Sequence, residues 1–458
     1  MSERSVPPAT RQSATRADRA HLIHPLQHPS EHQAPKIWVK GEGSIVTDIE
    51  GRTYLDALSG LWNVNIGHGR KELAAAAAAQ MEQLAFMPCY TGASNLPAIE
   101  LSERLAGLTY PSINRFFFTS GGAESTESSL KTARFYWKAV GRPDKWKVIS
   151  REWAYHGVTL AAMSATGISA YWPMFEPRTP GFLHIPSPYP YYFNRAYERA
   201  GGAGSPGIAA ANLLEEAIRK EGAETIAAFI AEPVQGAGGV IVPQEDYFGR
   251  IREICDRYEI LFIADEVITG FGRTGKWFAL DHWGVEPDLV NFAKGITSGY
   301  VPLGGIGVSD RIARAIDDVD VQHRFMHAYT YSGHPTTCAV ALANLDYMER
   351  HDLVARAAET GAYLQARLKE LEGHPHIGET RGLGMIAAIE LVDDRTTRRQ
   401  FDPSLRIGAK FQAQMTERGV WSRINGDRYF LAPPLTTTRE EIDRIVEAAH
   451  TALARTFA

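Results

Sequence analysis

The chain has 458 residues, which is enough for two domains because a single hydrophobic core rarely extends beyond ~250–300 residues. It is 44% hydrophobic and 22% charged, with a net charge of -5, and this composition is typical of soluble proteins. It has no basic stripe and no run of ~18 apolar residues, so we expect neither a nucleic-acid partner nor a membrane span.

The cysteines and the N-terminal segment bear on location. Cys89, Cys255 and Cys338 are far apart in the sequence, which fits neither a disulfide framework nor a thiolate metal site, and we expect a cytoplasmic protein. The first 20 residues are polar and lack the apolar stretch of a secretory signal, so we expect them to be loosely held.

The segment 21–32 carries four histidines: His21, His24, His28 and His32. Helical spacing would align them as metal ligands, but Pro25 and Pro29 interrupt such a helix, and no carboxylate or cysteine pattern follows. We therefore interpret this segment as polar surface and predict no metal.

The first predicted elements precede residue 141. Residues 43–60, GSIVTDIEGRTYLDALSG, alternate apolar and polar side chains around the turn Glu50-Gly51, which predicts a β-hairpin. Residues 71–86 consist largely of strong helix formers and predict a helix. A strand over Arg115–Phe118, a turn of small residues and a helix to about Val140 follow.

Apolar runs then alternate with helical patterns. The predicted strands are WKVISRE (146–152), IAAFIAEPV (226–234), EILFIADEV (259–267), DLVNFAK (288–294) and GGIGVSD (304–310), with helices over 210–222 and 247–259. This alternation indicates an α/β fold whose mostly parallel sheet is covered on both faces. We interpret the Pro-, Gly- and Tyr-rich residues 187–207 as a surface loop.

The last part of the chain predicts a second, smaller domain. Residues 334–354 have the pattern of a long helix that leaves the large domain. From about Gly361 on, helices alternate with the strands GMIAAIELV (384–392) and GVWSRI (419–424), which is typical of a small α/β domain.

Two glycine-rich segments resemble phosphate-binding turns. Residues Ser120–Ala123 (SGGA) follow a strand and open a helix, so their N–H groups suit a phosphate; a plain tight turn is the alternative. Residues Gly270–Lys276 (GFGRTGK) formally match nucleotide-binding patterns, but Trp277 stands where a P-loop needs Ser or Thr. We therefore interpret the second segment as a glycine-rich loop.

The strand ILFIADEVITG (260–270) carries two acids near its end. Side chains alternate along a strand, so Asp265 and Val267 share one face and Glu266 points to the other. A buried carboxylate needs a cation or several donors, and Lys294 ends the next strand. We therefore expect Asp265 and Lys294 to lie close together, at the sheet edge where α/β folds bind ligands.

An acid, a lysine and an anion-binding turn at neighbouring strand ends suit pyridoxal phosphate. Lys294 would form the Schiff base, Asp265 would keep the pyridine nitrogen protonated, and Ser120–Ala123 would take the phosphate. Lys294 would then carry a proton between substrate and cofactor. The alternative to a cofactor site is that the acid, the lysine and the glycine-rich turn are three unrelated structural features.

Four segments resemble the class III, fold type I, pyridoxal-phosphate aminotransferases: FIAEPVQGAGGVIVP, LFIADEVITGFGRTG, FAKGITSGYVPLGG and YTYSGHP. The resemblance covers nearly the whole chain and is strongest to the ω-amino acid and amine:pyruvate transaminase branch. It implies a large cofactor-binding domain of residues 66–335, a small C-terminal domain of residues 336–458, and an N-terminal segment of residues 1–65 that packs with the small domain.

The resemblance also implies roles for individual residues. The implied cofactor-binding residues are Ser120, Gly121, Gly122, Tyr155, His156, Glu232, Gln235, Asp265, Val267, Lys294 and Thr330. Lys294 and Asp265 would be the catalytic pair, and Tyr155 and Val267 would cover the two faces of the ring. Thr330 would reach the phosphate held by the neighbouring subunit, and Glu232 and Gln235 would lie near the phenolic oxygen.

The phosphate turn departs from the family in one respect. Relatives often have Ser-Gly after an Asn, whereas this chain has Ser120-Gly121-Gly122. The resemblance then implies that Gly121 contributes a backbone N–H to the phosphate instead of a hydroxyl.

The resemblance implies a substrate pocket formed by Trp62, Tyr90, Tyr155 and Arg423. Trp62 would be its aromatic wall, Tyr90 would come from the partner subunit, and Arg423 would bind the carboxylate of a keto acid and move away for an amine. For Trp62 the alternative is a core tryptophan, and for Arg423 it is a surface ion pair.

The prediction is a dimer, or dimer of dimers, that moves an amino group from an amine or ω-amino acid to pyruvate. A rival within the family is an aminomutase or a dialkylglycine-type decarboxylase, which shares the cofactor residues. Rivals of other classes are a non-catalytic binding protein on the same fold and a nucleotide-dependent enzyme that uses Gly270–Lys276.

Overall fold

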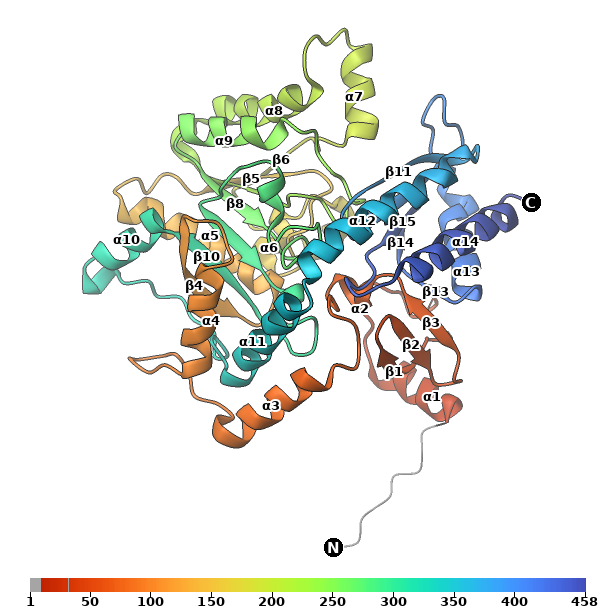
Figure 1. Cartoon of the computed structure of the whole chain (residues 1–458). Helices are drawn as coiled ribbons and strands as arrows, with labels where there is room; N and C mark the ends of the chain where they lie inside the picture. The colour runs from red at the N-terminus through yellow and green to blue at the C-terminus, as the bar shows by residue number, and fades with distance from the viewer. Residues whose placement is uncertain (1–9, 32) are drawn as a thin grey trace, which may run out of the picture.

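The computed structural model describes residues 10–31 and 33–458 (Figure 1). Within these residues the central sheet has seven strands, in the order β4-β10-β9-β8-β7-β5-β6. Their bounds are β4 Ile113–Thr119, β5 Lys147–Arg151, β6 Phe182–Ile185, β7 Ile226–Ala231, β8 Leu261–Asp265, β9 Leu289–Phe292 and β10 Gly304–Ser309. β5 to β9 pair in parallel, and β10 is antiparallel to both neighbours, which confirms the mostly parallel sheet.

Helices cover both faces of this sheet. The helices of this part are α3 Lys71–Leu84, α4 Leu96–Ala106, α5 Gly122–Ala139, α6 Leu160–Ala165, α7 Pro190–Arg199, α8 Pro206–Glu221, α9 Tyr247–Arg257, α10 Asp310–Asp318 and α11 Pro335–Arg350. Ile230 and Ile263 pack with Trp137 of α5, whereas Phe229 and Phe262 pack in the core with α8 and α9. The strands are therefore buried on both sides, which explains their continuous apolar sequences.

The C-terminal part and the N-terminal segment form two smaller sheets in the described residues, in the orders β11-β12-β15-β14 and β1-β2-β3-β13. Their elements are β1 Trp38–Glu42, β2 Ile45–Asp48, β3 Thr53–Asp56, α2 Ser59–Trp62, α12 Leu353–Lys369, β11 Ile377–Leu383, β12 Ile386–Leu391, α13 Ile407–Glu417, β13 Val420–Trp421, β14 Ile424–Asn425, β15 Arg428–Leu431 and α14 Arg439–Thr456. β3 pairs in parallel with β13, so both ends of the chain share one sheet (Figure 1). The boundaries at residues 65 and 335 stay predictions.

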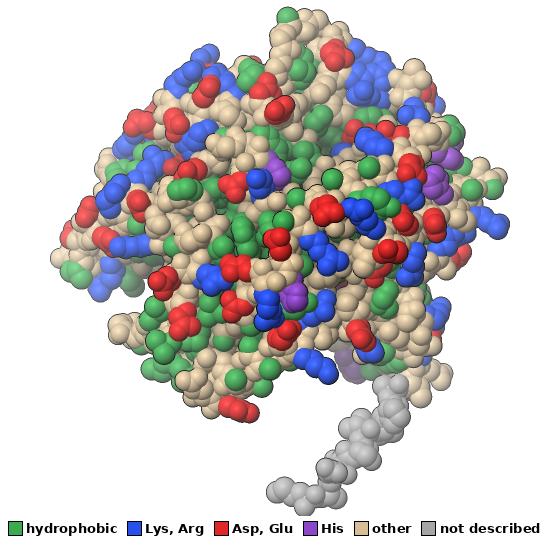
Figure 2. All heavy atoms as spheres, in the orientation of Figure 1, with side chains coloured by type: hydrophobic (Ala, Val, Ile, Leu, Met, Phe, Trp, Pro, Cys, Tyr) green, Lys and Arg blue, Asp and Glu red, His purple; other side chains and the backbone are tan. Residues whose placement is uncertain are grey.

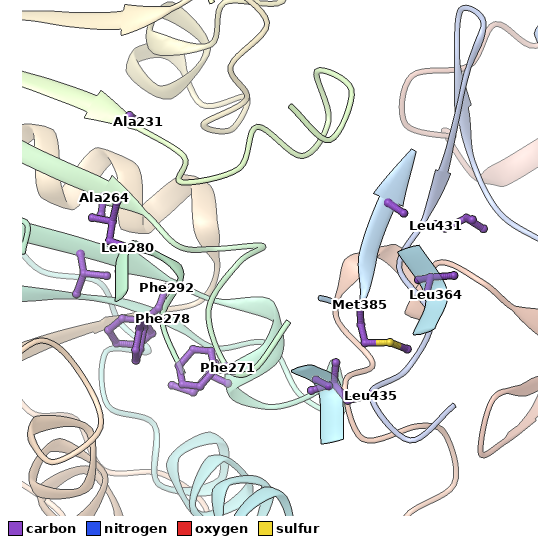
Figure 3. Packing of buried hydrophobic residues seen from close by; sticks show 14 of the residues in the cluster. Ala231, Ala264, Phe271, Phe278, Leu280, Phe292, Leu364, Met385, Leu431 and Leu435 are labelled. Atoms are coloured by element: carbon purple, nitrogen blue, oxygen red, sulfur yellow. The ribbon is translucent and has the colours of Figure 1, made fainter. Parts of the chain in front are cut away.

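The apolar core continues from the large sheet toward the C-terminal part. Figure 3 shows Phe271, Phe278 and Phe292 on one side, with Met385 and Leu435 opposite them. Short 3-10 turns connect the main elements at Ser169–Tyr171, Pro173–Phe175, Ala223–Thr225, Ala279–His282, Lys294–Ile296, Val321–His323, Glu370–Gly373 and Pro403–Leu405.

Two sequence predictions are wrong. Part of the supposedly loose N-terminus is a helix, α1 Arg11–His21, because Thr10 caps it by accepting from the N–H of Ser13; residues 1–9 lie outside the described residues. The supposed loop 187–207 contains α7, which begins at Pro190 in the favourable first position. Its Tyr191 packs on Ile241 and Val392, so tertiary burial stabilises the helix.

The surface is of mixed charge. Figure 2 shows acidic and basic side chains interspersed over the visible face. None of the helices formed by the described residues combines the length and the apolar character that crossing a membrane requires. The described residues also contain no group of three or more His, Cys, Asp or Glu side chains arranged to hold a metal ion, and His32 of the histidine segment lies outside them.

Candidate active site

The carboxyl ends of β7, β8 and β9 border a cavity of about 310 Å³. Figure 3 locates this edge, because Ala231 and Ala264 lie at the ends of β7 and β8. The cavity is lined by Pro25, Leu26, Leu61, Trp62, Gly122, Ala123, Tyr155, His156, Gly157, Val158, Tyr171, Glu232, Ala237, Asp265, Val267, Ile268, Lys294 and Arg423. It is therefore an apolar pocket with a few charged groups, which is the usual character of a small-molecule site.

The sheet brings Asp265 and Lys294 to the same cavity, as their strand positions predict. Asp265 ends β8 and is opposite Asn291 of β9, and Lys294 follows the end of β9. Lys294 has a φ of +48°, a left-handed conformation that a lysine rarely adopts. Such backbone strain persists where the surroundings hold it, and it is common at functional sites.

The environment of Lys294 favours the neutral amine. Its pKa is lowered from 10.5 to about 8: burial is the main cause, the carboxylates of Asp265 and Glu232 oppose the shift, and the positive charge of Arg423 adds to it. A lysine with a pKa near 8 is a far better nucleophile and base at neutral pH than an exposed lysine.

Asp265 is held by a second buried group. Its Oδ2 lies 2.7 Å from Nδ1 of His156, and its Oδ1 accepts from the N–H of Val267 at 3.2 Å. Nε2 of His156 is buried without a hydrogen-bond partner among the described residues. Residue 266 points to the other face, where the Glu266 carboxylate accepts from the Tyr110 hydroxyl and from the N–H groups of Ala279 and Leu280.

Glu232 and Gln235 differ in their relation to the cavity. Glu232 lines it and accepts from the N–H groups of Tyr155 and Gly236, each at 2.9 Å, while burial raises its pKa. Gln235 is fully buried outside the lining, where its amide accepts from Ser187 at 2.6 Å and donates to the carbonyl of Glu152 at 2.9 Å. The structure therefore places Gln235 as a support of the loop rather than a wall residue.

The N-terminus of α5 opens on the same cavity. Gly122 and Ala123 line it, whereas Ser120 and Gly121 lie just outside, and the N–H of Ser120 already donates to Glu124 at 2.8 Å. A Cβ on Gly122 would lie 2.9 Å from Cγ1 of Val267, so the close approach of strand and helix requires glycine there.

The cavity has aromatic, aliphatic and cationic walls. Tyr155 and Val267 both line it, and Trp62 is buried with its ring centroid 5.5 Å from that of Phe430. Arg423 lies between β13 and β14 and makes no ion pair within residues 10–31 and 33–458. The guanidinium is therefore available to an anion in the cavity.

Besides Ser120, Gly121 and Gln235, two further predicted residues do not line the cavity of their own chain. Tyr90 and Thr330 are exposed on the surface. Conversely, Pro25 and Leu26 are exposed, as the interpretation of segment 21–32 as surface expects, but they also line the cavity with apolar side chains, which that interpretation did not predict. A turn after α1 brings these two residues to the site from outside the large domain. In the sequence, the only sign of this role is that they are apolar within a polar segment.

The residues at the cavity fit pyridoxal phosphate. The set contains an amine with a lowered pKa, a buried carboxylate, two side chains for the ring faces and a helix N-terminus for the phosphate. The buried Nε2 of His156 has hydrogen-bonding capacity left for a bound group.

Comparisons with known proteins agree with this chemistry. The family model for class III aminotransferases matches residues 26–453. The chain is 42% identical over 446 residues to putrescine–pyruvate aminotransferase of Pseudomonas aeruginosa, covering 96% of this chain and 95% of that protein.

Solved structures show the same similarity. An (S)-enantioselective omega-transaminase from Thermomicrobium roseum is 48% identical and superposes with a TM-score of 0.94. The superposition covers 98% of this chain and 100% of that one. An amine transaminase from an uncultivated Pseudomonas species, solved in its PLP-bound form, is 41% identical, with a TM-score of 0.90 over 95% and 98% of the two chains. The chain with the strand-end lysine and aspartate therefore belongs to the pyridoxal-phosphate-dependent class III aminotransferases.

Proposed function

We propose that this protein transfers an amino group from an amine or ω-amino acid to pyruvate or a similar keto acid, which yields an aldehyde or ketone and alanine. The observation that carries the proposal is Arg423, a cation without an ion-pair partner in the described chain, in the same apolar cavity as Lys294. The putrescine–pyruvate aminotransferase and omega-transaminase relatives support it.

The cofactor supplies an electron sink that stabilises negative charge on the substrate carbon. Lys294 would hold the cofactor through Nζ, and its neutral amine would carry a proton from the substrate carbon to the cofactor. Asp265, oriented by His156, would pair with the pyridine nitrogen and favour its protonated form. The N–H groups that begin α5 would hold the phosphate, and Tyr155 and Val267, which line the cavity, would exclude water from the ring faces.

The substrate side of the cavity explains how one pocket serves two unlike substrates. Pyruvate carries a carboxylate, which a guanidinium binds in bidentate fashion, so Arg423 serves the acceptor. A simple amine carries an apolar tail, for which the cavity offers the apolar lining residues Trp62, Leu61 and Ile268. The backbone around Arg423 is held, because its carbonyl accepts from the N–H of Phe430 and Gly426 closes the tight β14–β15 hairpin, so the movement falls to the long side chain of Arg423.

We also propose that the protein is a homodimer, or a dimer of dimers, with active sites completed by the partner, and that it works in the cytoplasm. Exposed apolar side chains on segments 81–99 and 326–331 support the dimer: Met81, Leu84, Phe86, Met87, Tyr90, Leu96, Ile99, Met326 and Tyr331. Tyr90 and Thr330 occur in these segments, where a partner's cavity can receive them. Light scattering coupled to size exclusion measures the molecular mass, and a monomer would contradict the proposal.

A donor panel tests the activity. The purified holoenzyme is given β-alanine, putrescine, taurine or an aryl-alkyl amine, each with pyruvate, and alanine is measured. Alanine that forms in proportion to donor consumed supports the transaminase. Carbon dioxide release from a 2,2-dialkyl amino acid, added to the panel for this purpose, would indicate a decarboxylase. Isomerisation without an acceptor would indicate an aminomutase, and no reaction with any donor would contradict an enzyme of this type.

A further inference from the structure

The wall residue Trp62 lies in a strained turn. Ser59, Gly60 and Trp62 have φ values of +49°, +64° and +65°. They belong to the short element α2, which has helix-type hydrogen bonds but not the backbone angles of a helix. L-residues rarely occupy this region, and such conformations persist only where neighbouring groups hold them. Something next to the turn must therefore supply the constraint that fixes the indole in the cavity wall.

Asp56 supplies much of that constraint. It ends β3, is 1% exposed, and accepts from the N–H of Leu58 at 3.2 Å and from the N–H of Gly60 at 2.6 Å. Its Oδ2 also lies 2.8 Å from Nε2 of His68. One buried carboxylate thus fixes two N–H groups of the turn, at the residues that enclose Ser59.

A second anchor holds the same turn through Ser59, which contacts Arg273 of the large domain and Ala432 of the C-terminal part. The Ser59 hydroxyl donates to the carbonyl of Ala432 and accepts from Nη2 of Arg273 at 3.1 Å. Arg273 is fully buried and also donates to carbonyls at Met385 and Pro433. This arginine belongs to the glycine-rich loop Gly270–Gly275, whose role here is to tie the turn to both domains.

Asp56 is also joined to the strand that leads to the cationic wall. It is opposite Trp421 in the β3–β13 pair, and the N–H of Ala57 donates to the carbonyl of Trp421 at 2.9 Å. Arg423 follows two residues later. Both pocket walls, Trp62 and Arg423, therefore extend from backbone adjacent to this carboxylate.

We propose that Asp56 is a positioning residue that sets donor preference by holding the Leu58–Trp62 turn, and so the Trp62 wall, in place. The proposal rests on the proposed transaminase function for its kinetic consequence. The positional part concerns this chain alone and can be measured without turnover. Asp56 touches no substrate, so its effect must pass through Trp62.

Asp48 provides a matched control. It ends β2 in the same sheet, is also 1% exposed, and caps a turn by accepting from the N–H groups of Glu50 and Arg52 at 3.1 and 3.0 Å. Its turn does not line the cavity. Asp48→Asn and Asp56→Asn therefore each remove a buried carboxylate that caps a turn, and Asp48 in addition pairs with Lys36 and Arg52, but only the second change bears on Trp62.

The first measurement is fluorine NMR of full-length holoenzyme labelled with fluorotryptophan. The chain has nine tryptophans, and the signal that disappears in Trp62→Ala belongs to Trp62. Asp56→Asn should shift or broaden that signal, whereas Asp48→Asn should leave it unchanged. An unchanged Trp62 signal in Asp56→Asn would overturn the proposal, whatever the activity of the protein.

The second measurement is the ratio of kcat/KM for an aryl-alkyl amine to that for a short amine, with pyruvate as acceptor. Asp56→Asn should change this ratio by roughly tenfold or more, because a misplaced wall alters discrimination between donors of different size. In a Trp62→Ala background the same substitution should change the ratio little, since the wall is already gone. A change that persists without Trp62 would overturn the proposal.

Should Asp56→Asn fail to fold, Ser59→Ala removes the second anchor of the same turn and should shift both readouts in the same direction. No effect of Ser59→Ala on the Trp62 signal would count against a wall held by these contacts. If the unaltered protein made no alanine from any donor, the proposed function would fail, while the NMR comparison would still decide the positional claim.

Discussion

Lys294 should attach pyridoxal phosphate with a pH dependence centred near 8. Burial lowers its pKa from 10.5 to about 8, which corresponds to about 3 kcal/mol of differential interaction between the protonated and neutral amine. At pH 7 about one lysine in ten is then neutral, compared with roughly one in three thousand at the ordinary pKa. The neutral form is the nucleophile, so this population sets the rate of attachment.

The assay mixes apoprotein with pyridoxal phosphate in a stopped-flow instrument and follows the visible absorbance from pH 6 to 10. The rate constant should rise about tenfold per pH unit up to about pH 8 and level off above it. Lys294→Ala should show no pH-dependent change in the cofactor's own absorbance after mixing, because no bond to the protein forms. Lys145 is an internal control, because burial also lowers its pKa to about 8 but its Nζ donates to the carbonyls of Ala223 and Ile226, outside the cavity lining.

Two results would refute the reasoning. A rate that continued to rise tenfold per unit to pH 10 would mean that Lys294 has an ordinary pKa. Borohydride reduction followed by peptide mapping should place the label on Lys294. A label on Lys145 would show that a lowered pKa alone, without the cavity, determines attachment.

Three further predictions follow from the site. Arg423→Ala should raise KM for pyruvate by roughly 10- to 100-fold, because a charged, hydrogen-bonded pair with the carboxylate is lost. The half-reaction with a neutral-tailed amine should change little. An equal loss of activity with pyruvate and with the amine would mean that Arg423 supports the fold instead. Asp265→Asn should keep the melting temperature of the holoenzyme but lower turnover by at least ~100-fold, and near-normal turnover would make Asp265 structural. Glu266, whose pKa burial raises to about 7, binds a proton more tightly when folded, so its contribution to stability falls by about 3 kcal/mol as pH rises from 4.5 to 7. Denaturant unfolding of Glu266→Gln should show a flatter pH dependence than the unaltered protein, and parallel curves would contradict the assignment.

The arrangement around the sheet could be predicted because it depends on local pattern. Strand periodicity separates Asp265 from Glu266, and the parallel pairing of β8 and β9 brings Lys294 beside Asp265. These two inferences require only the strand pattern and the order of neighbouring strands, and no contact between residues far apart in the sequence. The hairpin of β2 and β3 followed from the same kind of evidence.

The parts that could not be predicted depend on distant partners. Leu26 reaches the cavity from a segment before the first strand, and its polar neighbours conceal that placement. The Gly270–Gly275 loop matched nucleotide motifs, whereas its function in the structure comes from Arg273 and carbonyls more than a hundred residues away. α7 is stabilised by burial against Val392, which local composition does not report.

The pairing of β3 with β13 also has a consequence for how this chain matures. Leu55 is opposite Val420, so the ribosome must synthesise most of the chain before β3 obtains its parallel partner. Such non-local pairing is slow, and meanwhile β3 is an open strand edge that another nascent chain can occupy. Truncations that end before Val420 should therefore aggregate through this edge, even though the large sheet, which ends at Ser309, is complete within them.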